Sequence, residues 1–294
     1  MANLKEVRNR IVSVSSTQQI TSAMKMVSAA KLKRAQDAIM QMRPYAIKLR
    51  EILENLSSGL DSSEGGAYTK QREVKKVLLV VITSNRGLCG GFNANIIKKA
   101  SLMMRSDYAH AKVSVLTIGK KASDFFKKSG YHLVSTHNEL FDALTYKNVA
   151  PVAETIMHNF STGTYDKIEL VYNQFKNAAV QLPLSEQFLP VLPPANTADK
   201  TADKKKTHTD YLFEPGKAEI VQDIIPRSLK TQLFKALLDS QASEHGARMT
   251  AMHKATDNAK ELIKVLKLNY NKARQAAITG EILEIVGGSE ALNN

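Results

Sequence analysis

The stretch of this chain whose residues could most readily do chemistry is a glycine-rich loop from Ser84 to Asn93. It follows an apolar run typical of a buried strand and precedes a helical pattern, so a phosphate group could sit on the helix N-terminus. The loop lacks the Gly-x-Gly-x-x-Gly spacing of dinucleotide-binding folds, and no Gly-Lys-Ser/Thr sequence follows it. We interpret it as a tight turn that lets the strand and the helix pack closely. A nucleotide-dependent enzyme using Gly87 to Gly91 is an alternative.

The other reactive side chains form no recognisable site. Cys89, the single cysteine, would be a nucleophile only beside a base, and we interpret it as a small buried thiol. The seven histidines are scattered. His245 and His253 lack the His-Glu-x-x-His spacing of a zinc site, so we expect both to be solvated. The sequence therefore predicts no catalytic residue, no cofactor and no metal in this chain.

The bulk composition points to an acidic partner. The formal net charge of +13 is compatible with nucleic acid, anionic lipid or an acidic protein surface. The longest apolar run, Val77 to Ile82, is far short of the roughly twenty residues of a membrane span. The polar start does not resemble a signal peptide, and a single cysteine excludes an internal disulfide and suits a reducing compartment. We expect a cytosolic protein or one bound peripherally to a membrane.

Two long terminal helices organise the chain. Near the C-terminus, apolar or small residues recur at alternating spacings of three and four, which is the seam of a coiled coil. These positions are Met249, Met252, Thr256, Ala259, Ile263, Leu266, Tyr270, Ala273 and Ala277. The N-terminal segment has the same rhythm at Leu4, Val7, Ile11 and Val14, and again at Leu32, Ala35, Ile39, Met42, Ala46, Leu49, Leu53 and Leu56. We therefore expect the two helices to pair.

The N-terminal seam turns polar in its middle, at Gln18, Thr21, Lys25 and Ser28. Apolar residues leave the seam there, namely Ile20, Ala23, Met24, Met26 and Val27. A basic collar of Lys25, Lys31, Lys33 and Arg34 adjoins them. At the other end of the chain, Ile278, Ile282, Leu283, Ile285 and Val286 crowd several faces of the last turns. Both stretches predict contact with a partner protein, acidic at the collar and hydrophobic at the tip.

Between the helices the pattern changes to short strands alternating with helices. We expect strands at 77–83, 112–118, 131–135 and 167–175, and helices capped by Asn93 up to 105, at 120–128 and at 149–160. This alternation predicts a mostly parallel sheet covered on both sides, with 178–192 as an edge strand or hairpin arm.

The predicted domains are an N-terminal coiled-coil helix (1–58), an α/β domain (74–192), a linker (193–216) and a C-terminal coiled-coil helix (217–288). Pro226 is expected to divide a short helix over 217–225 from the long one. The fold class is α/β, a long antiparallel coiled coil of the terminal helices with an inserted Rossmann-like domain.

Three motifs, in the right order, resemble the gamma subunit of the F-type ATP synthase, in its bacterial form. They are Ile20 to Val27 with Ala29 to Leu32, the loop Arg86 to Gly90, and Tyr270 to Thr279. The two-cysteine insert of chloroplast members is absent. Gly280 stands where glutamine or lysine is common in the family, and a helical glycine costs up to about 1 kcal/mol. The tip is therefore expected to be softer than in relatives.

The resemblance implies that the chain is the central rotor shaft, coupling proton-driven rotation of a membrane ring of c subunits to ATP synthesis at the beta subunits. One copy would stand inside three alpha and three beta subunits, with the α/β domain contacting the epsilon subunit and the ring, at the cytoplasmic face of the cell membrane. Contact roles carry over to Met24, Lys25, Gln275, Thr279 and Glu281, and the tip formed by Ile282, Leu283, Ile285 and Val286 would turn in an apolar sleeve. A coiled-coil nucleic-acid-binding protein is the alternative, supported by the charge alone.

Overall fold

The computed structural model describes residues 4–57, 67–191 and 217–292. The chain divides into two compact units, residues 1–29 with 248–294 and residues 30–247. Two long helices, α1 (Leu4–Ser57) and α5 (Lys217–Leu292), contribute to both units. The predicted linker over 193–216 lies outside the described residues.

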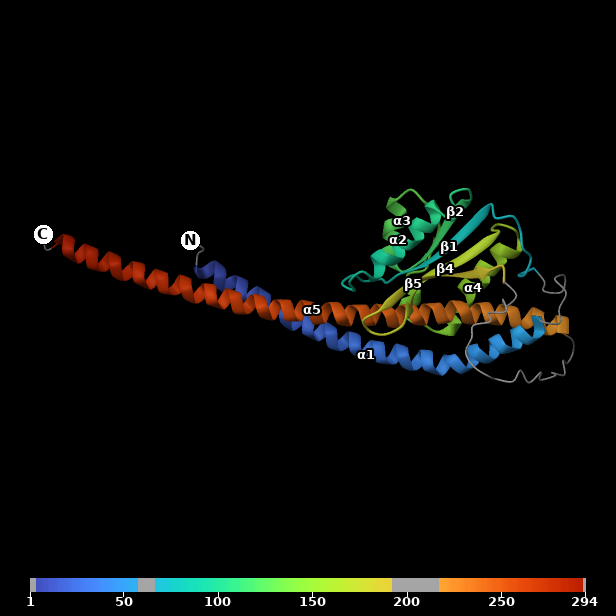
Figure 1. Ribbon diagram of the computed structural model, residues 1–294, viewed down its shortest axis with the longest axis horizontal. Helices are drawn as coiled ribbons and strands as arrows, with labels where there is room; N and C mark the ends of the chain where they lie inside the picture. Colours follow the sequence, from blue (N-terminus) through green and yellow to red (C-terminus); the bar gives the residue numbers. More distant parts are fainter. Residues whose placement is uncertain (1–3, 58–66, 192–216, 293–294) are drawn as a thin grey trace, which may run out of the picture. The chain divides into compact units, whose positions relative to one another are not determined.

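The second unit contains a five-stranded sheet (Figure 1). Its strands are β1 (Lys76–Ile82), β2 (Lys112–Ile118), β3 (His132–Thr136), β4 (Lys167–Phe175) and β5 (Gln181–Leu189), in the order β3-β2-β1-β4-β5. The first four are parallel and β5 runs antiparallel beside β4. The predicted parallel sheet and edge strand are confirmed. Pro183 lies in this edge strand, where the missing N–H can be tolerated.

Helices cover both faces of the sheet, as Figure 1 shows. One face packs against α2 (Phe92–Arg105) and α3 (Lys120–Lys128), the other against α4 (Tyr146–Ser161) and the first half of α5. Because side chains alternate along a strand, β1 supplies Val77, Leu79 and Val81 to the first face and Leu78, Val80 and Ile82 to the second. All six side chains are buried. At about 1.5–3 kcal/mol for each side chain, this strand anchors both layers.

Two expectations about helix ends are wrong. Asn93 does not cap α2, because Gly91 occupies the N-cap and the Asn93 side chain turns to Ser84 instead. Pro226 does not begin a new helix but lies inside α5. The adjoining residues Ile225 and Leu229 are buried in the core against the sheet. This tertiary packing outweighs the loss of one backbone hydrogen bond at the proline.

A small charged group is buried where β4 begins. The Tyr108 hydroxyl donates a hydrogen bond to Glu169 Oε1 at 2.5 Å, and Lys167 Nζ donates to the Tyr108 oxygen at 2.9 Å. Lys167 also lies 2.8 Å from Glu169 Oε1. Burial, together with the hydrogen bond to Glu169, raises the pKa of Tyr108 to about 12. The hydroxyl therefore stays protonated far into the alkaline range.

Candidate partner-binding surface

In the first unit, α1 and α5 pair in opposite directions. The Thr256 hydroxyl donates to the Thr21 hydroxyl at 2.8 Å, and Lys25 Nζ lies 3.4 Å from His253 Nδ1. Residue numbers rise along α1 while those of the facing residues of α5 fall, so the two helices are antiparallel. The predicted seam residues of this unit are buried or half-buried, among them Thr21, Ser28, Met252, Thr256, Ala259 and Leu266. In this unit the seam prediction and the antiparallel coiled coil are confirmed. The side chains of the predicted seam positions Ala46, Leu53 and Leu56 lie outside the described part of the structure.

The polar part of the seam is internally bonded. Thr21 donates onward to the carbonyl of Gln18 at 3.0 Å, and Ser28 donates to the carbonyl of Met24 at 2.7 Å. The Thr21 and Ser28 hydroxyls therefore donate to carbonyls of their own helix, and the bond from Thr256 to Thr21 crosses between the helices. A buried polar pair in a coiled-coil seam favours one register over the alternatives.

A charged cluster lies beside this pair. His253 Nδ1 is 3.2 Å from Asp257 Oδ2, and Lys260 Nζ is 3.5 Å from Asp257 Oδ1. Because His253 Nδ1 faces both Lys25 and Asp257, it accepts from the lysine when unprotonated and donates to the carboxylate when protonated. His253 is exposed, as expected, although it has partners. The expectation for His245 is wrong: it is buried in the second unit, where residues 242–247 of α5 are all buried.

Beside the polar seam, α1 presents apolar side chains to solvent. Ile20, Met26 and Val27 are 59%, 65% and 57% exposed, while the predicted contact residues Met24 and Lys25 are half-buried. Large apolar side chains gathered on one exposed stretch mark an interaction surface.

The C-terminal tip of α5 has no facing helix among the described residues. Since Thr21 faces Thr256 in an antiparallel pair, Leu4, the first residue of α1, falls opposite the region of Ala273. Beyond that point the predicted tip residues Ile282, Leu283, Ile285 and Val286 are 55%, 66%, 72% and 54% exposed. Their apolar surface is open to a partner.

The predicted polar contact residues near the tip are also exposed, namely Gln275, Thr279 and Glu281. The Thr279 hydroxyl donates to the main-chain carbonyl of Gln275 at 2.9 Å. These residues are not gathered with Lys25, which faces His253 more than twenty positions earlier in α5. At 1.5 Å per residue the two areas are roughly 30 Å apart along the helix.

Three exposed apolar residues of α5 were not predicted, namely Leu262 at 41%, Val265 at 52% and Leu268 at 62%. All three lie off the seam positions Ile263, Leu266 and Tyr270. On α1, Ile20 and Val27 were identified because they are apolar and lie outside the seam positions. The same criterion would have identified these residues of α5. The surface open to a partner therefore continues between the polar seam and the tip.

The glycine-rich loop is a tight turn, as interpreted. Leu88 and Gly90 have positive φ angles of 62° and 60°. The Asn93 amide donates to Ser84 Oγ at 2.9 Å and to Cys89 Sγ at 3.1 Å, while the Ser84 backbone N–H donates to Asn93 Oδ1 at 3.0 Å. The cysteine is buried. The polar groups at the base of the loop thus bond to one another.

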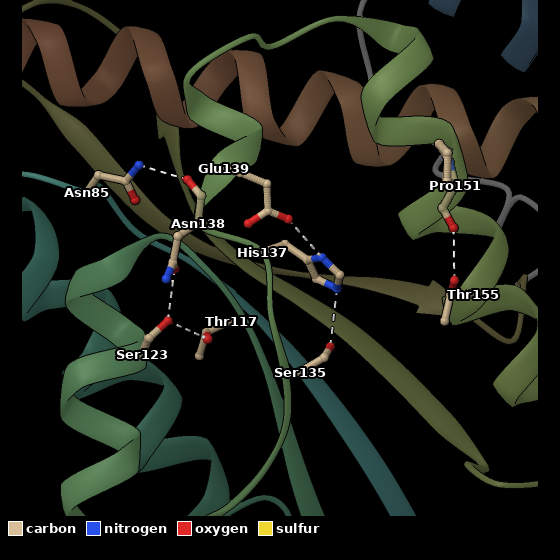
Figure 2. Close-up of polar contacts among 9 residues, drawn as sticks. All are labelled: Asn85, Thr117, Ser123, Ser135, His137, Asn138, Glu139, Pro151 and Thr155. Atoms are coloured by element: carbon tan, nitrogen blue, oxygen red, sulfur yellow. Dashed lines mark hydrogen bonds and ion pairs between the residues drawn. The ribbon is translucent and has the colours of Figure 1, made fainter.

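Polar side chains at the carboxyl ends of β1 and β2 also bond among themselves (Figure 2). Asn85 donates to the Asn138 carbonyl at 2.8 Å, and Ser123 donates to Asn138 Oδ1 at 3.0 Å. Ser123 lies 2.8 Å from Thr117 Oγ1. Open α/β sheets bind ligands at this edge. Here the bonds join the loops that follow β1 and β3 to α3.

The described part of the chain has neither a candidate membrane span nor a candidate metal cluster. No helix there is both long and apolar enough to cross a membrane. Within the same ranges, no three acidic, histidine or cysteine side chains gather as they would around a metal ion.

Comparisons with known proteins cover the whole chain. The family model described as ATP synthase matches residues 3–292. The ATP synthase gamma chain of Flavobacterium johnsoniae is 64% identical over 294 residues and covers 100% of both chains. That of Chlorobaculum tepidum is 46% identical, with 99% of each chain covered.

Solved structures share the fold at lower identity. A chain of the Euglena gracilis mitochondrial ATP synthase rotor aligns with a TM-score of 0.67 and 22% identity, covering 94% of this chain and 98% of that one. A chain from the solved central stalk and c-ring of the Tetrahymena thermophila mitochondrial ATP synthase gives a TM-score of 0.59 and 24% identity, covering 80% of this chain and 99% of that one.

Proposed function

This chain belongs to the family of ATP synthase gamma chains, and from that premise we propose that it is the central rotor shaft of its enzyme. In this role it carries rotation, driven by ions crossing the membrane, to the nucleotide sites of the beta subunits. Family membership favours this function over the nucleic-acid-binding alternative. The rotor function also agrees with the glycine-rich loop, where the polar groups at the base of the loop bond to one another.

The observation that carries the proposal is the uncovered apolar tip. Four large apolar side chains in the last turns of α5 are each more than half exposed. Such a surface is costly in water, and about 25 cal/mol is gained for each Å² of it that a partner covers. An apolar sleeve made by the alpha and beta subunits, three of each, would cover it and still let it turn.

The coupling residues follow from the same surface. Met24 and Lys25 are assigned to the contact with an acidic segment of the beta subunit, beside exposed Met26 and Val27. Gln275, Thr279 and Glu281 are assigned to the second contact, below the tip. A single asymmetric shaft presents different faces to three beta subunits, so each is biased toward a different nucleotide affinity.

The remaining partners are assigned to the α/β domain. It would contact the epsilon subunit and the ring of c subunits, with one copy of this chain in each complex. The protein would then lie peripherally at the cytoplasmic face of the cell membrane. The domain division proposed for this role is the one drawn above, with helices at 1–58 and 217–288 and the α/β domain at 74–192.

Co-expression with the alpha and beta subunits of the same organism tests the proposal. Size exclusion and an ATPase assay should show one copy in a complex with three of each, and faster turnover than the hexamer alone. A folded chain that forms no complex would refute the rotor function. Steeply salt-dependent DNA binding would then favour the nucleic-acid alternative.

A further inference from the structure

Two loops of the α/β domain meet α5 over one turn, from Ser243 to Ala247. The first is the glycine-rich loop, whose Cys89 and Phe92 are 1% and 2% exposed and form a buried cluster with Ala247. The second is the turn between β4 and β5, residues 176–180. All of these residues belong to the second unit, and the cluster encloses the last residue of α5 assigned to that unit.

Hydrogen bonds tie the same turn of α5 to β4 and to the loop. The Ser243 hydroxyl donates to the Asn173 carbonyl at 3.1 Å. The Asn173 amide in turn donates to the Phe92 carbonyl at 3.1 Å. Ser243 and Asn173 are 0% and 1% exposed. The helix, the strand and the loop are therefore joined through one buried asparagine.

The turn between β4 and β5 lies so close to α5 that only a residue without a side chain fits at position 246. A Cβ at Gly246 would lie 3.2 Å from both the Cα and the carbonyl oxygen of Ala178. The turn has little freedom to retreat, because Asn177 Oδ1 accepts from the N–H groups of Ala179 and Val180 at 3.0 and 2.7 Å. Gln181 also donates to the Ala178 carbonyl at 3.1 Å. Glycine is the residue that fits this contact.

We propose that these contacts form a grip through which the α/β domain passes torque to α5. The inference rests on the proposed rotor function and assigns the glycine-rich loop a mechanical role. Torque on the domain must reach the continuing helix through side contacts. A contact of backbone on backbone, closed by a buried hydrogen-bond relay, resists twisting because neither side can change rotamer. Ser243 and Gly246 are positioning residues in this mechanism.

The test measures the torsional stiffness of the assembled enzyme. With the hexamer fixed to a surface and the motor stalled, a probe on the α/β domain reports angular fluctuations. Gly246→Leu forces the β4–β5 turn away, and Ser243→Ala removes the bond to Asn173. Each should increase the angular variance over that of the wild-type enzyme, while ATP hydrolysis by the hexamer complex stays unchanged.

Gly287→Ala is the control for Gly246→Ala, because it makes the same change in helix propensity elsewhere in α5. Both replace a helical glycine by alanine, but a Cβ at Gly287 meets nothing within 4 Å. The variance should increase at position 246 alone. Ser16→Ala is the control for Ser243→Ala, because Ser16 donates to the Val12 carbonyl of its own helix on an exposed face.

The outcomes separate the grip from the rotor function. A wild-type chain that neither joins nor activates the hexamer refutes the rotor function before any variant is compared. Assembled variants with wild-type variance refute the grip. If Gly246→Leu does not assemble, Ser243→Ala and Gly246→Ala decide. Failure of all three variants to assemble would show that the contacts only support folding, which also overturns the proposal.

Discussion

Replacing Gly280 by alanine should stiffen the tip of α5. The residue lies inside α5, which continues to Leu292, and a Cβ at this position meets nothing within 4 Å. The substitution therefore has no steric cost. It should gain the full difference in helix propensity between glycine and alanine, about 1 kcal/mol.

That gain should appear as slower local opening. Since 1.4 kcal/mol corresponds to a factor of ten, about 1 kcal/mol slows exchange of the neighbouring amides by about fivefold. Amide hydrogen exchange of the full chain, read over residues 276–286, measures this directly. The helix pair over 250–266 should exchange as in the wild type, because it is stabilised by the seam.

Gly246→Ala is the contrasting variant. It offers the same gain in propensity, but the new Cβ meets the Ala178 backbone at 3.2 Å, so protection near it should not increase. Equal protection gains at both positions would show that the backbone contact imposes no penalty. Unchanged or faster exchange around position 280 would refute the reasoning about the tip.

Three further predictions concern coupling, helix register and pH dependence. Met24→Lys adds a cation beside a basic collar, so the reconstituted enzyme should pump fewer protons per ATP; a wild-type ratio would contradict the contact role. Thr21→Val and Thr256→Val should each lower the free energy of unfolding by about 0.5–1.5 kcal/mol, because each removes the interhelical hydrogen bond. The double variant should lose no more than either single variant, since both remove the same bond. Additive losses of thermal stability would argue against this coupling. Tyr108 keeps its proton in the folded chain up to about pH 12 but loses it near its ordinary pKa of 10.0 when unfolded. The folded state thus binds more protons between these values, and stability falls as pH rises through them. Tyr108→Phe should reduce this loss, measured as the urea midpoint above and below that ordinary pKa; parallel losses in both proteins would contradict it.

The apolar runs of the strands and the three-four spacing of the helices could be recognised in the sequence because each depends on local geometry. Val77 to Ile82 is apolar at every position, which predicts a strand buried on both faces, and the structure covers both. The seam through Thr21 and Thr256 followed from spacing alone, as did the exposure of Ile20 and Val27. Burial on one stripe of a helix is a property of the sequence period.

Element ends depended on packing that is distant in sequence. Asn93 has the chemistry of a helix cap, yet its side-chain oxygen accepts from the Ser84 N–H instead of from its own helix. Pro226 has the chemistry of a helix start, yet the core around Ile225 and Leu229 keeps one helix through it. His245 reads as a surface residue on a charged helix, but it lies where the second unit encloses α5.

The sequence by itself determined the terminal coiled coil, the inserted parallel sheet and the apolar tip, because these follow from the period of apolar residues along the chain. Only the tertiary structure decided that Asn173 joins Phe92 to Ser243, and that Gly246 admits the Ala178 backbone. These contacts join segments about seventy or more positions apart. No local pattern encodes such a meeting, because it exists only once the sheet and α5 have packed together.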